Sequence, residues 1–496
     1  MIALQLNFRP ALPNVYGASD YREFRDQLSQ IDKLLRGSGV EKALIDSAMA
    51  RCQRGAKQEG VRITQAKRQR HWKQLHYAFR CNVARQLTGE SFRMFSIRLA
   101  DSSLLQWFTG ISAFEHRKAA SKSSLERYDK CFHLEEVEQA IRSVIGKVVH
   151  EKTAGELGLD QAIRLDAVFA DCTCVKANIH FPVDWVLLRD SARTLIAAIK
   201  LIRAQGLKHR MPEPSGFVKR MNQLSLEMTH ARRRPDSKKV RKGVLRSMKK
   251  LARTIEKHGQ RYRLVLSENW EQTQWSQAQA GLVLGRIDNV LGKLPDAIRQ
   301  AHERIIGERR LANDQKRLSL YEEDVHVLVR GKAGSEVEFG NGLYLAEQQD
   351  GLIVDWALFK DQPPADTKLV KKSMQRMNQA YGPIEAFCAD RGFDALANVN
   401  LLKDQQVYNA ICPRNPMIMA ERNKEPRFMQ LQNRRAATEA RIAIFKNAYL
   451  GRPLRSKGFA HKQNTMVWGV LTHNLWVLAR MVLAQERERK RKRTAA

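Results

Sequence analysis

Strand-like segments of this chain fall into two groups, and a long helical stretch separates them. The first is residues 165–175, a short apolar run with polar flanks, which indicates a buried strand. The second is residues 336–359, where Gln-Gln-Asp-Gly at 348–351 joins two strand-like runs and predicts a hairpin. About 160 residues of mostly helical periodicity lie between the groups. If these strands form one sheet, a large helical insertion separates its first strand from the others in the sequence.

The segments after the hairpin alternate between helix and strand. We expect a helix at 366–381, a strand at 384–389, a helix from about 394, a strand at 407–412 and a helix at 434–449. This alternation predicts an α/β mixed sheet with helices packed on it. The N-terminal third has helical periodicity, with expected helices at 23–35, 40–52, 63–87, 98–110 and 121–128. The last of these is capped by serine, and an alternative is that it belongs to a helix-turn-helix.

The C-terminal region combines an apolar stretch with a basic tail. Residues 466–483 contain Thr472, His473 and Asn474, so we expect a core helix and not a membrane anchor. Residues 485–496 are expected to form a basic, frayed tail. The start of the sequence lacks the pattern of a signal peptide. These features predict a soluble, cytoplasmic protein with no membrane partner.

The charge of the chain calls for a polyanionic partner. It has 86 Lys and Arg against 52 Asp and Glu, a formal net charge of +34. Released phosphate counterions drive sequence-independent binding of such proteins to nucleic acids, although charge alone does not choose DNA over RNA. Residues 232–263 hold fourteen Lys or Arg and two acids. This segment predicts a phosphate-contacting surface, the alternatives being a solvated helix face or a disordered arm. Its candidate contacts are Arg232, Arg233, Arg234, Lys238, Lys239, Arg241 and Lys242.

The seven cysteines are odd in number and scattered, which predicts reduced thiols. Cys172 and Cys174, with His180 nearby, form the only close group. A closed zinc site needs a second paired motif, so we favour two small side chains on a buried strand.

Three acids occupy positions suited to phosphoryl chemistry. We expect Asp171 to end the first buried strand and Asp390 to end a later one, and the crevice beyond strand carboxyl ends is the usual ligand site of open α/β sheets. Glu439 lies in the predicted helix 434–449, on one stripe with Arg435, Ile442 and Lys446. The alternatives are a turn at Asp171, a helix cap at Asp390 and a surface ladder of ion pairs around Glu439.

These segments together resemble the DDE transposases of bacterial insertion sequences, whose catalytic core is RNase H-like. Arg435-x3-Glu439-x6-Lys446 matches the third motif of one large branch, but Gln432 stands where that branch has tyrosine. Asp-Cys-Thr at 171–173 and Ala-Asn-Ile-His-Phe-Pro-Val-Asp at 177–184 are similar to the first-aspartate region. Ala-Asp-Arg-Gly-Phe at 389–393 is similar to the second-aspartate motif.

The resemblance implies an RNase H-like core at 160–184 and 328–484, a helical N-terminal region at 1–150 for DNA binding or dimerisation, and a basic helical insertion at 185–327. It implies that Asp171, Asp390 and Glu439 are the catalytic, metal-binding acids, with Mg²⁺ or alternatively Mn²⁺ as cofactor. Arg435 and Lys446 would contact the DNA backbone. Asn178 and His180 are weaker candidates, since a loop histidine is more often structural.

The function that the resemblance implies is transposition. Such an enzyme binds the double-stranded ends of a mobile element as a homodimer, hydrolyses the phosphodiester bond there and joins the 3′-hydroxyl to target DNA. The alternatives are an inactive, transposase-derived regulator that binds nucleic acid, and a nuclease on the same fold that cuts without joining.

Overall fold

The computed structural model describes residues 11–111, 119–332, 335–451 and 453–495. The chain is mostly helical and has one mixed sheet of six strands. It divides into two compact units. Unit 1 comprises Met1–Lys176, Gly342–Phe359 and Pro363–Ala496, and unit 2 comprises Ala177–Asn341 and Lys360–Gln362.

The N-terminal part of unit 1 consists of helices, as predicted. They are α1 (Ser19–Ser38), α2 (Val40–Gln58), α3 (Gln65–Thr88), α4 (Phe92–Asp101), α5 (Ser103–Thr109), α6 (Lys122–Tyr128), α7 (Leu134–Val148) and α8 (Glu151–Glu156). The single helix expected at 98–110 is wrong. Ser102 ends α4 with an extended backbone, and its side chain accepts a hydrogen bond from the Leu105 amide to cap α5. Ser121 caps α6 in the same way, which confirms the serine cap there.

The sheet follows the order β2-β3-β1-β5-β6, with β4 also paired to β3. Its strands are β1 (Ala167–Lys176), β2 (His326–Lys332), β3 (Ser335–Gln348), β4 (Ile353–Leu358), β5 (Ala386–Ala389) and β6 (Tyr408–Ile411). The hairpin of β3 and β4 is antiparallel, as Asp-Gly predicted, and Gly351 takes a φ of 99° in its turn. β1 pairs with β5, and β5 with β6, in parallel. The sequence did not indicate β2, which pairs with the part of β3 that belongs to unit 2.

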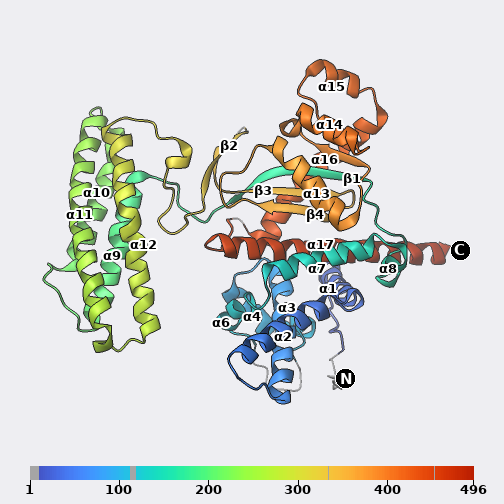
Figure 1. Ribbon diagram of the computed structural model, residues 1–496, viewed down its shortest axis with the longest axis horizontal. Helices are drawn as coiled ribbons and strands as arrows, with labels where there is room; N and C mark the ends of the chain where they lie inside the picture. The colour runs from blue at the N-terminus through green and yellow to red at the C-terminus, as the bar shows by residue number, and fades with distance from the viewer. Residues whose placement is uncertain (1–10, 112–118, 333–334, 452, 496) are drawn as a thin grey trace. The chain divides into compact units, whose positions relative to one another are not determined.

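The two faces of the parallel strands are both covered. On one face, Phe169 and Cys388 pack with Phe428 of α16 (Pro426–Ile444). On the other face, Val168 and Phe387 join the main core of unit 1. The helices that follow the hairpin are α13 (Leu369–Tyr381), α14 (Leu396–Asp404), α15 (Pro416–Arg422) and α16, drawn in orange in Figure 1.

The predicted helix at 434–449 is longer than expected. It begins as α16 at Pro426, since proline fits the first helical turn, where no amide hydrogen bond is lost. At Phe445 it continues into the π-helical segment η7 (Phe445–Leu450). The absence of glycine and proline from 434–449 correctly predicted a helix there, but it did not predict that the helix begins at Pro426.

The long C-terminal helix α17 (Phe459–Ala495) is a core helix of unit 1, as predicted. By length and composition it resembles a membrane span, but 72% of its apolar window is buried, and such burial is typical of core helices in soluble proteins. The side-chain amide of Asn474 pairs with both backbone groups of Ile353, at 2.8 and 2.9 Å, and so fixes β4 to the helix. The prediction that residues 485–496 form a frayed tail is wrong. The helix continues to Ala495, with an ion pair from Arg487 to Glu23.

Unit 2 contains a four-helix bundle formed by the stretch expected to be a helical insertion. Its helices are α9 (Asp184–Ala204), α10 (Pro214–His230), α11 (Ser237–Asn269) and α12 (Gln277–Ala301), which run alongside one another in Figure 1. Each helix contributes one apolar face to a core of its own, which includes Leu195, Met221, Leu245 and Ile287. The order of elements in the chain is therefore strand, helical bundle, hairpin, and then alternating helices and strands.

Candidate active site

Asp171 and Asp390 are neighbours across two parallel strands. The prediction that Asp171 ends its strand is wrong, because β1 continues to Lys176 and Asp171 lies within it, whereas Asp390 directly follows β5. The parallel register of β1 and β5 aligns Phe169 with Cys388 and Ala170 with Ala389, and the two aspartates are the next residues along. Side chains alternate along a strand, so both aspartates belong to the face that carries Phe169 and Cys388. Adjacent strands are about 4.8 Å apart. The fold thus brings together two of the three acids that the sequence singled out.

Each of these carboxylates is oriented by its own local backbone. Asp171 Oδ1 accepts a hydrogen bond of 2.6 Å from the Cys172 amide. Asp390 Oδ1 accepts one of 2.8 Å from the Gly392 amide and caps the 3-10 turn η6 (Arg391–Phe393). Both aspartates are half-buried. The cap that was the alternative reading of Asp390 is therefore present, and it holds the side chain at the end of the sheet.

Helix α16 and η7 cover this face and are anchored beside both aspartates. Gln432 Nε2 donates hydrogen bonds to the carbonyl oxygens of Ala410, at 2.6 Å, and of Ala389, at 3.3 Å. Lys446 Nζ donates one of 2.9 Å to Thr173 Oγ1. Ala389 directly precedes Asp390 in the sequence, and Thr173 is on the same face of β1 as Asp171. The helical segment 432–446, which carries the third motif, therefore contacts the end of β5 through Gln432 and β1 through Lys446.

Glu439 lies on the stripe between these two anchors. It is seven residues from Gln432 and seven from Lys446, about two helical turns in each direction, and its side chain is exposed. Its neighbour Thr438 donates a hydrogen bond of 2.8 Å to Glu347 Oε1 and so fixes the rotation of the helix. Within the described residues, no three His, Cys, Asp or Glu side chains gather closely enough to hold a metal ion. The structure therefore places Asp171 beside Asp390, but Glu439 does not form a group of three metal ligands with them.

The cations of the stripe are held close to the sheet. Arg435 Nε donates a hydrogen bond of 3.0 Å to Gln432 Oε1, so the same glutamine that reaches the strand carbonyls also orients this guanidinium. Arg434, which the sequence did not single out, stacks 4.5 Å from the Phe169 ring and pairs with Glu347. Arg434 is thus a structural anchor.

Asp366 is an acid of this region that the sequence analysis missed. A Cβ atom placed on Gly392 would lie 2.8 Å from Asp366 Oδ2 and 2.9 Å from Asp390 Oδ1, so the two carboxylates are neighbours. Burial raises the pKa of the Cys172 thiol, and Asp366, Asp171 and Asp390 raise it further, which places all three acids around this cysteine. Asp366 opens the turn η5 (Asp366–Lys368) before α13, a position where an acid usually signals only a helix cap.

The chemistry of this edge suits magnesium. Mg²⁺ prefers carboxylate oxygens and is commonly bound by one or two carboxylates together with waters and substrate phosphates. The adjacent Asp171 and Asp390 meet that need, and a closed protein cage of three or more ligands is not required. The zinc alternative lacks support, since within the described residues Cys172 and Cys174 belong to no metal-binding group and all seven cysteines are free thiols.

The remaining predicted residues belong to unit 2. Asn178 and His180 are exposed in the segment between β1 and α9. Of the basic candidates, Arg233, Arg234, Lys238 and Lys239 are exposed, Lys238 and Lys242 pair with Glu308, and Arg241 lies 5.6 Å from the Trp185 ring. The side chain of Arg232 lies outside what the structure describes.

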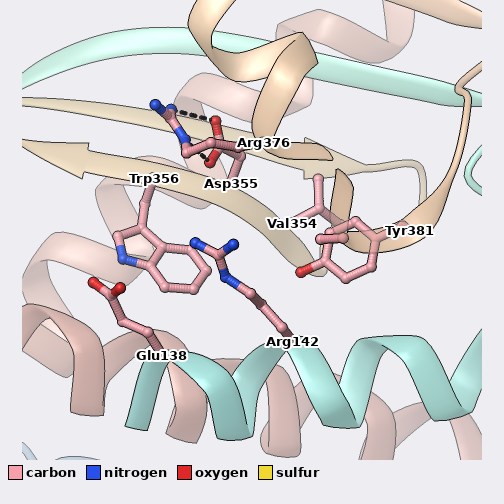
Figure 2. Close-up of a pocket in the computed structure, with 8 residues that line it drawn as sticks. Glu138, Arg142, Val354, Asp355, Trp356, Arg376 and Tyr381 are labelled. Carbon is pink, nitrogen blue, oxygen red and sulfur yellow. Dashed lines mark hydrogen bonds and ion pairs between the residues drawn. The ribbon is translucent and has the colours of Figure 1, made fainter. Parts of the chain in front are cut away.

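A pocket of about 160 Å³ lies elsewhere in unit 1, against β4. Figure 2 shows Arg142 of α7 extending toward the space between Trp356 and Tyr381, while Arg376 binds both oxygens of Asp355, at 2.7 and 2.6 Å. Asp171, Asp390 and Glu439 are not among its lining residues. The pocket is therefore separate from the paired aspartates.

The geometry described here stands without a known relative: no family model, no curated protein and no solved structure matches this chain.

Proposed function

We propose that this protein is a DDE transposase, which cuts the ends of a mobile DNA element and joins them to target DNA. One observation carries the proposal. Asp171 of β1 and Asp390, which directly follows the adjacent parallel strand β5, lie beneath the helical segment that bears Arg435, Glu439 and Lys446. Five residues at the spacing of the family motifs thus share one region of one unit.

The order of elements supports an RNase H-like core. A first strand, a hairpin, and then alternating helices and strands build one mixed sheet, with β1, β5 and β6 parallel. The bundle of unit 2 follows β1 directly in the chain, as the expected insertion does. The net charge of +34 fits a double-stranded DNA partner. A homodimer on DNA and a cytoplasmic, nucleoid-associated location belong to the same proposal.

The chemistry assigns a task to each side chain. Phosphodiester cleavage places growing negative charge on the attacking and leaving oxygens, and bound divalent ions supply its stabilisation and activate the nucleophile. Asp171 and Asp390 would hold Mg²⁺, or Mn²⁺ in its place, and Glu439 would complete the ligand set as DNA binds. Arg435 would pair with a backbone phosphate through its two-pronged donor group. Lys446 would place its ammonium beside Thr173 as a second phosphate contact.

The experiment is a cleavage and strand-transfer assay with the full-length protein. Its substrate is a duplex that carries any inverted repeats found on either side of the coding region, with a label at the 5′ end so that the 3′-hydroxyl stays free to join. Asp171→Asn, Asp390→Asn and Glu439→Gln keep the side-chain shapes, and each is expected to abolish cleavage and joining while DNA binding persists. Glu421→Gln, at an exposed position of α15, is the matched control and is expected to behave as wild type.

Three outcomes contradict the proposal. Normal cleavage by all three variants would remove the acids from the chemistry. Cutting without joining by the wild type would identify a nuclease, and binding without either reaction would identify a regulator.

A further inference from the structure

Helix α11 carries a straight row of exposed cations along its whole outer face. We call this the α11 cation row. On 3.6-residue geometry its members fall within a stripe about 80° wide. The opposite side of the helix carries Leu245, Ile255 and Tyr262, which are fully buried in the bundle core. The row consists of Lys239, Arg246, Lys250, Arg253, Lys257 and Arg261, all exposed.

Three other cations of the same helix form ion pairs. Lys238 and Lys242 pair with Glu308, at 3.4 and 2.8 Å. Arg263 pairs with Asp288. In the part of the chain that the structure describes, no ion pair involves a member of the row. Glu256 is the only acid in the sequence between its ends. Its charge acts on Arg253. The row is therefore a line of six cations with one acid beside it.

The dimensions of the row match a turn of duplex DNA. Its ends, Lys239 and Arg261, are 22 residues apart in one continuous helix, which corresponds to about 33 Å. One turn of B-DNA is about 34 Å long. A rigid helix that spaces cations over this length can contact successive backbone phosphates without the entropy cost of ordering a flexible arm.

We propose that the α11 cation row binds the phosphate backbone of double-stranded DNA over about one turn, without reading its sequence. This inference rests on the proposed function only in taking DNA as the partner. The surface itself is distinct from the acids of unit 1. It lies within the segment 232–263 that the sequence predicted as a phosphate-contacting surface. Of the candidate contacts named there the row keeps only Lys239, because Lys238, Arg241 and Lys242 have partners of their own. The contact shifts from the start of the basic segment to the middle and end of α11.

Other polyanions fit the row less well. Membrane-surface helices need an exposed apolar face, and the apolar face of α11 is buried in the bundle. Single-stranded nucleic acids are bound with aromatic side chains that stack on bases, and no aromatic residue belongs to the row. A duplex backbone requires only ordered positive charge, which the row supplies.

The test measures how DNA affinity depends on salt. The row variant replaces Arg246, Lys250, Arg253 and Lys257 by glutamine, which preserves helix propensity. The control variant replaces the exposed Arg193, Lys200, Lys219 and Arg220 of α9 and α10 by glutamine, which removes the same charge from the same unit. Full-length proteins bind a random-sequence duplex in EDTA, where no metal-dependent reaction occurs, over about 50–200 mM NaCl.

The row variant is expected to lower the slope of log affinity against log salt by about 3 to 4, and the control by less than about 1. Arg246→Lys with Arg253→Lys keeps the charge and is expected to keep the wild-type slope. If the row variant still binds DNA with an unchanged slope of log affinity against log salt, the row is not a DNA contact. That result does not affect the proposed function. Equal losses in row and control variants, or a preference for duplex RNA, also overturn the row. A wild-type protein that binds no duplex DNA would contradict both the row and the proposed function. A wild-type protein that binds duplex DNA normally but neither cleaves nor joins it would contradict only the proposed function.

Discussion

The side-chain amide of Gln432 donates a hydrogen bond of 2.6 Å to the carbonyl oxygen of Ala410, at the end of β6. The same amide reaches Ala389 of β5, and its oxygen accepts from Arg435. One side chain thereby joins α16 to two parallel strands and orients a guanidinium. The transposase branch that this chain resembles has tyrosine at this position, and a single hydroxyl proton could not serve both carbonyl groups.

Replacing Gln432 by leucine should therefore weaken both the fold and the site. Two carbonyl groups and Arg435 lose a partner, so we expect unit 1 to lose about 1–3 kcal/mol in free energy of unfolding. Cleavage should slow as well, because Arg435 is no longer oriented. Urea denaturation and the cleavage assay measure the two effects. Gln430→Leu, at an exposed position of the same helix, is the control and should change stability by about 0.5 kcal/mol or less. Equal effects of both substitutions would contradict this account.

Asp366 offers a second prediction, because its carboxylate is a neighbour of Asp390. Like charges at short range destabilise a protein without metal. Asp366→Asn should therefore raise the melting temperature in EDTA, while the Mg²⁺ concentration for half-maximal stabilisation increases about tenfold, as for other supporting residues of metal sites. Thermal melts across a Mg²⁺ titration measure both. Asp361→Asn, an exposed acid five residues earlier, should change neither. A lower melting temperature with an unchanged Mg²⁺ midpoint would show that Asp366 only stabilises its turn.

The sequence predicted those parts of the fold that depend on local pattern. The apolar run of β1 and the Asp-Gly turn before Gly351 specify a strand and a hairpin through neighbouring residues alone. The serine before α6 does the same for its cap. Asp171 and Asp390 could be found because Asp171 belongs to a recognisable buried strand, Asp390 directly follows another, and these two strands are parallel neighbours.

Features that depend on contacts between distant segments were not predictable. Asp366 meets Asp390 and Cys172 only after the chain has folded, and its own surroundings resemble an ordinary helix start. The short strand β2 is defined by its pairing with β3 and not by its own sequence. Similarly, a list of basic residues could not show that Lys238 and Lys242 are paired with Glu308 whereas Lys250 and Lys257 are not.

A buried ionic network in the N-terminal helices gives a third prediction. Arg80 of α3 is 2% exposed and pairs with Asp32 of α1 and Glu41 of α2, so it ties three helices together. Arg80→Met removes the buried cation from both carboxylates. Asp32 keeps its ion pair with Arg36, and Glu41 keeps its contact with His76. The substitution should cost about 3–5 kcal/mol in free energy of unfolding. Adding Asp32→Asn and Glu41→Gln to the same protein should recover much of that loss. Denaturation of the single and triple variants measures this, and a triple variant less stable than the single one would contradict it.

The pH dependence of stability provides the last prediction, through His473 of α17. Burial beside the rings of Phe445 and Tyr449 lowers the pKa of His473 to about 4, against 6.5 for an exposed histidine. As the pH falls, the unfolded chain therefore takes up this proton before the folded protein does, and the folded state loses stability between about pH 6.5 and 4. Above that window the contribution is complete. Between pH 7 and 5 the wild type should lose about 2 kcal/mol through this residue alone.

His473→Gln keeps a polar side chain of similar size but does not titrate. Its free energy of unfolding should be lower than that of the wild type at pH 7, where the native packing of the ring is lost, yet it should fall less steeply toward pH 5. All other titrating groups are shared by the two proteins, so the difference between their curves isolates His473. Urea denaturation at half-unit pH steps gives both curves. Curves that remain parallel across the range would mean that His473 is not held in its neutral form by the core.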